Sequence, residues 1–104
     1  MELLLISANP RQAWTLKTLI SMSLPSWTCD CAETLEQGLA LLRQGEYSAM
    51  ILDPEFADIS GIDSCRRLLK EQPSTPMLFL VFSHEEEIGR EAVALGAVQY
   101  LLKE

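Results

Sequence analysis

The stretch that decides the fold is Ala49-Met50-Ile51-Leu52-Asp53, an apolar run that closes on a single carboxylate. A short apolar run of this kind is typical of a strand buried on both faces of a parallel sheet. A charge at the end of a buried strand is costly unless it is paired or used. In an open α/β sheet, the carboxyl ends of the strands form the crevice where ligands bind. Asp53 is therefore the first candidate functional residue.

Outward from this run, apolar segments alternate with helical patterns along the whole chain. This alternation predicts an α/β fold, with a parallel sheet whose strands are joined by crossover helices. We expect strands over 2–7, 27–31, 47–53, 77–82 and 98–102. We expect helices that begin after Asn9, at the Ser60 cap and at the Ser83 cap, the last of which ends at Gly96. We expect a further helix that carries Leu35, Leu39 and Leu42 on one stripe and ends at Gly45.

Size and charge exclude several classes of partner. The chain has 104 residues, enough for one domain, and a formal net charge of −7. Nucleic-acid and anionic membrane surfaces both require a basic footprint, so neither partner is expected. The longest apolar run, residues 77–82, is too short to span a bilayer. No basic segment precedes the first strand, and we therefore expect a cytoplasmic protein.

The cysteines invite a metal or redox interpretation, which we set aside. Cys29 and Cys31 alternate with Trp27 on one face of the expected strand. A structural metal site needs about four ligands, and His84 is the only histidine in the chain. The sequence therefore predicts cysteines that act as small buried hydrophobic residues.

Five motifs in order resemble the receiver domain of two-component response regulators. They are Leu3–Ile6 leading to Pro10, Tyr47–Asp53, Gly61, Thr75-Pro76, and Gly96-Ala97-Val98-Gln99-Tyr100-Leu101-Leu102-Lys103. The resemblance covers essentially the whole chain. It implies a doubly wound, flavodoxin-like sheet of five parallel strands in the order 2-1-3-4-5. Residues 1–104 would form one receiver-like domain that stops after strand five, without sequence for the family's fifth helix.

The same resemblance implies roles for individual residues. Asp53 stands at the position that accepts a phosphoryl group, and Lys103 at the position that contacts it. Tyr100 stands at the aromatic position that reorients on activation, and Val81 at the position of the family's Thr/Ser switch.

Other positions depart from the family pattern. Ser7 and Ala8 occupy the place of two adjacent acidic residues that hold magnesium, and Phe82 replaces a small residue. Because Mg²⁺ is bound through carboxylates together with phosphate oxygens and water, the remaining metal candidates are Asp53 and Glu55, and we expect no metal to be held. We expect Asp53 and Lys103 to form a structural ion pair, and Glu55 to be a solvated loop charge.

These observations favour an atypical, or pseudo-receiver, variant that acts in signal transduction as a protein–protein interaction module, without enzymatic activity or a cofactor. Helix four and strand five would form the partner surface. The face left bare by the missing helix would be a contact surface, most simply of a homodimer.

Two alternatives stay open. The first is a working phosphoacceptor, modified on Asp53 by a histidine kinase, with a Mg²⁺ site rebuilt from Glu55, Asp58 or Asp30. The second is a small α/β enzyme. It ranks last because the sequence has no glycine-rich phosphate loop and no nucleophile–base pair.

Overall fold

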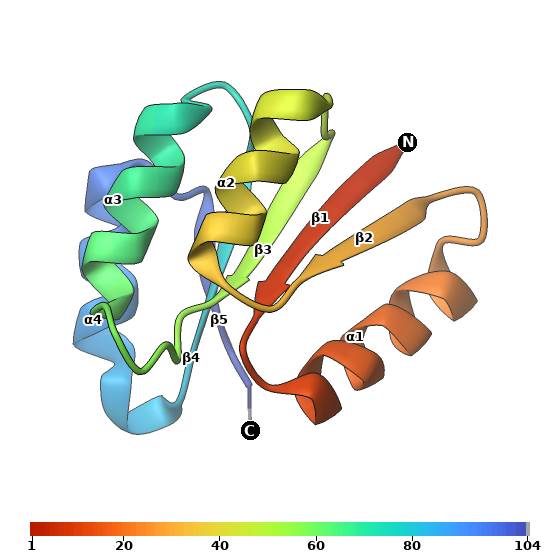
Figure 1. The fold of residues 1–104 in the computed structure, drawn as a ribbon. Coiled ribbons are helices and arrows are strands. Elements are labelled where there is room, and N and C mark those ends of the chain that lie inside the picture. The colour runs from red at the N-terminus through yellow and green to blue at the C-terminus, as the bar shows by residue number, and fades with distance from the viewer. Residues whose placement is uncertain (104) are drawn as a thin grey trace.

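Five parallel strands form the central sheet of the computed structural model, which describes residues 1–103. Their order is β2-β1-β3-β4-β5, as the sequence predicted. The sheet is α/β and flavodoxin-like, with crossover helices between its strands (Figure 1). The strands are β1 (Glu2–Ser7), β2 (Thr28–Ala32), β3 (Ala49–Asp53), β4 (Met77–Val81) and β5 (Gln99–Leu102).

The helices cover the two faces of the sheet unequally. In the described part of the chain, α1 lies on one face, and α2, α3 and α4 lie on the other (Figure 1). Their bounds are α1 (Pro10–Ser23), α2 (Leu35–Gln44), α3 (Gly61–Glu71) and α4 (Glu86–Leu95), with a short 3₁₀ turn at Ser83–Glu85 before α4.

Side-chain caps explain where three of these helices begin. The Asn9 side chain accepts hydrogen bonds from the backbone N–H groups of Arg11 and Gln12, and the Thr34 and Ser60 hydroxyls cap α2 and α3 in the same way. The predicted start of the last helix at Ser83 is wrong. A 3₁₀ turn comes first, and the Glu85 carboxylate accepts the Phe82 N–H at 3.2 Å, so the α-helix begins at Glu86.

The core has two layers because successive side chains of a strand point to opposite faces. On β1, Leu4 and Ile6 pack in the larger cluster beneath α2, α3 and α4, whereas Leu3 and Leu5 pack in the smaller cluster beneath α1. All four side chains are buried. This two-sided burial is the reason that the strand reads as a continuous apolar run.

The expectation for the cysteines is only partly correct. Cys65 is fully buried, but Cys29 is half-buried and Cys31 is exposed. The strand also begins one residue later than predicted, at Thr28, so that Ala32 reaches the core. The physical reason is that β2 lies at the sheet edge, where β1 is its one neighbouring strand.

The opposite edge strand, β5, is also incompletely covered. Leu101 and Leu102 are 44% and 47% exposed, and Val98 just before the strand is 62% exposed. The neighbouring Leu80 of β4 is buried nonetheless. Among residues 1–103, no helix combines the length and hydropathy that a bilayer crossing requires.

Candidate functional site

Asp53 lies at the carboxyl end of the central strand β3, directly beside Ser7 at the end of β1. The Asp53 side chain is only 1% exposed. A buried carboxylate needs partners that compensate for lost hydration. The Ser7 hydroxyl is one of them, because it donates a hydrogen bond to Asp53 Oδ2 at 3.1 Å.

Lys103 supplies the opposite charge. Its Nζ lies 2.6 Å from Asp53 Oδ1 and 2.9 Å from Glu55 Oε2. The Lys103 side chain is 3% exposed, and its backbone N–H donates to the Val81 carbonyl at 3.0 Å, which extends the pairing of β5 with β4 to this residue. The topology therefore brings the predicted pair together from strands three and five.

Two opposing effects act on the Lys103 ammonium. Burial favours the neutral amine and lowers its pKa, but hydrogen bonds to Asp53 and Glu55, together with their negative charges, outweigh burial, and the pKa of Lys103 is raised. The lysine is therefore charged at neutral pH and bridges two carboxylates.

Glu55 differs from its predicted role. The expectation of a purely solvated loop charge is wrong, because its carboxylate pairs with Lys103 although its side chain is 48% exposed. The loop after β3 starts with Pro54 and turns Glu55 back toward the crevice. The sequence signal for this pair was the placement of Glu55 two residues after the strand end.

Phe82 covers the ammonium group. The Lys103 Nζ lies 4.3 Å from the centroid of the Phe82 ring, within the range of a cation–π interaction. The exposed His84 ring stacks on Phe82, with centroids 5.7 Å apart and an interplanar angle of 9°. The sequence identified Phe82 only as a large residue where the family has a small one, and this attraction was not predicted, although Phe82 and Lys103 follow neighbouring strands.

The two switch positions occupy different environments. Val81 is buried and has no polar side-chain atom to offer the crevice. Tyr100 is half-buried and packs against α4, where Gly89 has no side chain; a Cβ built at Gly89 would lie 2.6 Å from Tyr100 Cγ. Tyr100 therefore packs against α4.

The donor atoms at this crevice do not fit a family-type magnesium site. Both Asp53 oxygens are engaged by Ser7 and Lys103, and Glu55 by Lys103. Ala8 has no donor, and the Asn9 side chain caps α1. Within residues 1–103, no cluster of three or more His, Cys, Asp or Glu side chains is arranged to hold a metal.

The other residues considered for a rebuilt metal site lie elsewhere. Asp30 pairs in register with Leu4, well before the strand ends, and accepts a hydrogen bond from the Tyr47 hydroxyl at 2.7 Å. Asp58 lines a separate pocket together with Phe56. The structure therefore does not bring Asp30 to Asp53.

Comparison with known proteins gives a consistent result. The sequence model of the response regulator receiver domain matches residues 3–104. The transcriptional regulatory protein CreB of Escherichia coli is 39% identical over 74 residues, 68% of this chain and 32% of that protein. The cell cycle transcriptional regulator CtrA of Caulobacter vibrioides is 31% identical over 104 residues, 99% of this chain and 44% of that protein.

Solved structures agree with the topology. The response regulator TrrA of Thermotoga maritima, in complex with Mg²⁺ and BeF, superposes with a TM-score of 0.82 at 25% identity, over 99% of this chain and 86% of that chain. A complex of the histidine kinase ThkA with TrrA matches with a TM-score of 0.82 at 24% identity, over 99% of this chain and 85% of that chain. The curated relatives are longer, since this chain spans less than half of CreB and of CtrA.

Proposed function

The chain belongs to the response regulator receiver domain family, and from that membership we propose that it is an atypical receiver, which signals by binding a partner protein without magnesium-dependent phosphorylation. Receiver domains are signalling modules of two-component systems rather than enzymes. The domain would span residues 1–104, and its output would depend on shape and contacts.

One observation carries this proposal: Asp53 is buried between the Lys103 ammonium and the Ser7 hydroxyl, and Ser7 and Ala8 provide no carboxylate beside it. Phosphoryl transfer to a carboxylate depends on positioning and on neutralisation of charge. Here Lys103 already neutralises Asp53, and the Ser7 hydroxyl binds its second oxygen. Phe82 lies over the ammonium, and Val81 offers no hydrogen bond to a phosphoryl group. These contacts support a closed ion pair, by which we mean that Asp53 and Lys103 bind each other and leave no open position for a metal or a phosphoryl group.

A cytoplasmic protein partner is proposed for the surface formed by α4 and β5. Several apolar side chains are exposed there, namely Ile88, Val93, Leu95, Val98, Leu101 and Leu102. Exposed apolar side chains of this kind favour a contact site. The homodimer is proposed for the other face of β5, on the α1 side of the sheet, where Leu101 pairs in register with Leu80.

Sedimentation velocity tests this surface. Leu101→Glu should shift a dimer to the monomer, whereas Met22→Glu, an exposed control on α1, should leave the sedimentation coefficient unchanged. A wild-type monomer at all concentrations would exclude the homodimer.

The second candidate is a working phosphoacceptor. It is favoured by the presence of Asp53 and Lys103, each at the end of a family motif, and by the fold shared with TrrA, which was solved with Mg²⁺ and BeF. In this alternative a histidine kinase would phosphorylate Asp53, and Mg²⁺ would have to bind with Asp53 and Glu55, Asp58 or Asp30 as its carboxylate candidates, because Ser7 and Ala8 provide none.

Exposure to acetyl phosphate and Mg²⁺, followed by intact-mass measurement, separates the two candidates. We expect no stable gain of one phosphoryl group on the wild-type chain, and the same result for Asp53→Asn. A gain on the wild-type chain that disappears in Asp53→Asn would establish the second candidate. Calorimetric titration with Mg²⁺ alone provides an independent readout, and micromolar affinity that depends on Asp53 would contradict the proposal.

A further inference from the structure

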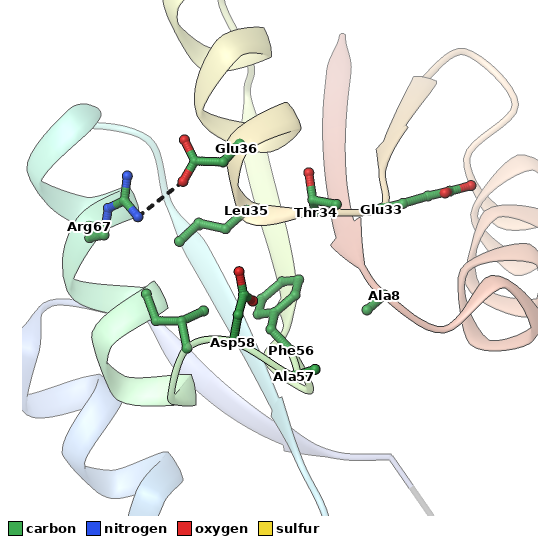
Figure 2. A pocket seen from close by; sticks show the side chains of 10 residues that line it. Ala8, Glu33, Thr34, Leu35, Glu36, Phe56, Ala57, Asp58 and Arg67 are labelled. Atoms are coloured by element: carbon green, nitrogen blue, oxygen red, sulfur yellow. Dashed lines mark hydrogen bonds and ion pairs between the residues drawn. The ribbon is translucent and has the colours of Figure 1, made fainter.

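A pocket separate from the Asp53 ion pair opens at the same edge of the sheet. Its volume is about 350 Å³, and it lies where the segments that follow β1, β2 and β3 meet (Figure 2). The lining residues are Ala8, Glu33–Glu36, Phe56–Ile59 and Arg67. Ligand pockets start at about 300 Å³, so this one has room for a single long side chain.

The floor of the pocket is apolar, and the carboxylate of Asp58 lies beside it. Leu35 is buried, and Phe56 and Ile59 are half-buried. Figure 2 shows the Asp58 side chain between the Phe56 ring and Leu35. No hydrogen bond or ion pair of the Asp58 side chain is found among residues 1–103. The pocket therefore combines an aromatic face, an aliphatic wall and an unpaired negative charge.

The surrounding charges do not neutralise Asp58. Arg67 is the one basic residue in the lining, and it forms an ion pair with Glu36 at 3.1 Å on the far side of the pocket (Figure 2). The amino end of α2 adds a partial positive charge, which Glu33 and Glu36 offset. Three carboxylates against one guanidinium leave the pocket with a net negative charge.

We propose that this pocket binds an arginine or lysine side chain presented by a partner protein. The aliphatic stem of such a side chain packs on Leu35 and Ile59, as long basic side chains do on apolar surfaces. Its cation then meets the Asp58 carboxylate and the face of Phe56. Charge complementarity selects this occupant over an acidic one, and the net charge of −7 acts in the same direction at longer range.

This inference rests on the proposed function, because it names what the partner presents. It does not depend on whether Asp53 is phosphorylated, because Asp58 lines the pocket and Asp53 does not. A failure in the following experiment would remove the pocket from the partner surface and leave the proposed closed ion pair untouched.

The test is a two-dimensional NMR titration of the ¹⁵N-labelled chain with the peptide acetyl-Leu-Arg-Leu-amide. The matched probe is acetyl-Leu-citrulline-Leu-amide, which keeps the shape and removes the charge. We expect saturable shifts at the amides of residues 33–36 and 56–59 with the arginine peptide, and at least tenfold weaker binding of the citrulline peptide.

Variants connect the shifts to the pocket. Asp58→Asn should weaken binding of the arginine peptide at least fivefold, and Phe56→Leu should weaken it while the chain stays folded. Glu46→Gln is the matched control, because it removes an equal charge from an exposed site at the other end of the sheet. Equal binding of both peptides, or equal losses in Asp58→Asn and Glu46→Gln, would overturn the inference.

Discussion

Replacement of Lys103 by methionine tests the closed ion pair, because methionine keeps most of the side chain and removes its charge. Asp53, which is 1% exposed, would then retain the Ser7 hydroxyl as a partner but lose its cation. Removal of one member of a buried ion pair costs about 3–5 kcal/mol. We expect Lys103→Met to lower the free energy of unfolding by about 3 kcal/mol, the low end, because Asp53 keeps one hydrogen bond.

Asp53→Asn should cost less, about 1–2 kcal/mol, because Lys103 keeps its contact with the half-exposed Glu55. This geometry therefore predicts a larger loss of stability for Lys103→Met than for Asp53→Asn. A double variant, Asp53→Met with Lys103→Met, should recover part of the stability, since an apolar pair leaves no uncompensated charge.

The assay is urea unfolding followed by far-ultraviolet circular dichroism at pH 7. Lys17→Met, an exposed control on α1, should stay within about 0.5 kcal/mol of the wild type. A loss below about 1 kcal/mol for Lys103→Met with an unchanged m-value, or a larger loss for Asp53→Asn, would refute the reasoning.

Three further predictions address other parts of the domain. Gly89→Ala should cost about 1–3 kcal/mol in urea unfolding because its Cβ would meet Tyr100 at 2.6 Å, whereas Gly45→Ala, with neighbours no closer than 3.8 Å, should be nearly neutral; equal effects would contradict the packing. Ser7→Asp combined with Ala8→Asp should lower Tm in the absence of metal, because the new carboxylates repel Asp53. Millimolar Mg²⁺ should raise Tm again, since a Mg²⁺ concentration one hundred times Kd adds about 2.7 kcal/mol to the free energy of unfolding. A Tm that does not change with Mg²⁺ would show that the acidic pair is not what the site lacks. Burial raises the pKa of the Cys65 thiol from 9.0 to about 11, so the folded chain retains a proton that the unfolded chain loses, and the urea midpoint should fall as pH rises from 9 to 11; Cys65→Ala should flatten that slope.

The sequence predicted the sheet because the signals for it are local. Each apolar run is flanked by a cap or a breaker such as Asn9-Pro10, Ser60 or Gly96, and Gly96 does end its helix with a φ of 133°. The pairing of Asp53 with Lys103 was predicted from the resemblance, which puts both residues at one site, and from the loss of the acidic pair at Ser7 and Ala8, which leaves Lys103 free to pair with Asp53. The capping pattern of Ser83 and Glu86 was misleading, because a 3₁₀ turn forms over Ser83–Glu85 in place of the expected helix start.

The rest depends on side-chain directions that no spacing encodes. The contact of Glu55 with Lys103 requires its loop to fold inward, and the Phe82 ring must turn its face to the ammonium. The pocket around Asp58 needs the ends of three strands and two loops at once. Such sites depend on tertiary geometry, which is why no sequence pattern indicated a pocket around Asp58.

The position of Lys103 directly after an edge strand has a dynamic consequence. Among the strands of residues 1–103, β5 is hydrogen-bonded to β4 alone, and the residue that follows β5 also neutralises Asp53 at the sheet centre. Fraying of this edge and solvent access to Asp53 are then one cooperative opening event. Amide exchange of residues 99–103 and carbodiimide labelling of Asp53 should consequently report the same opening free energy, so that any reagent directed at this carboxylate competes with strand closure.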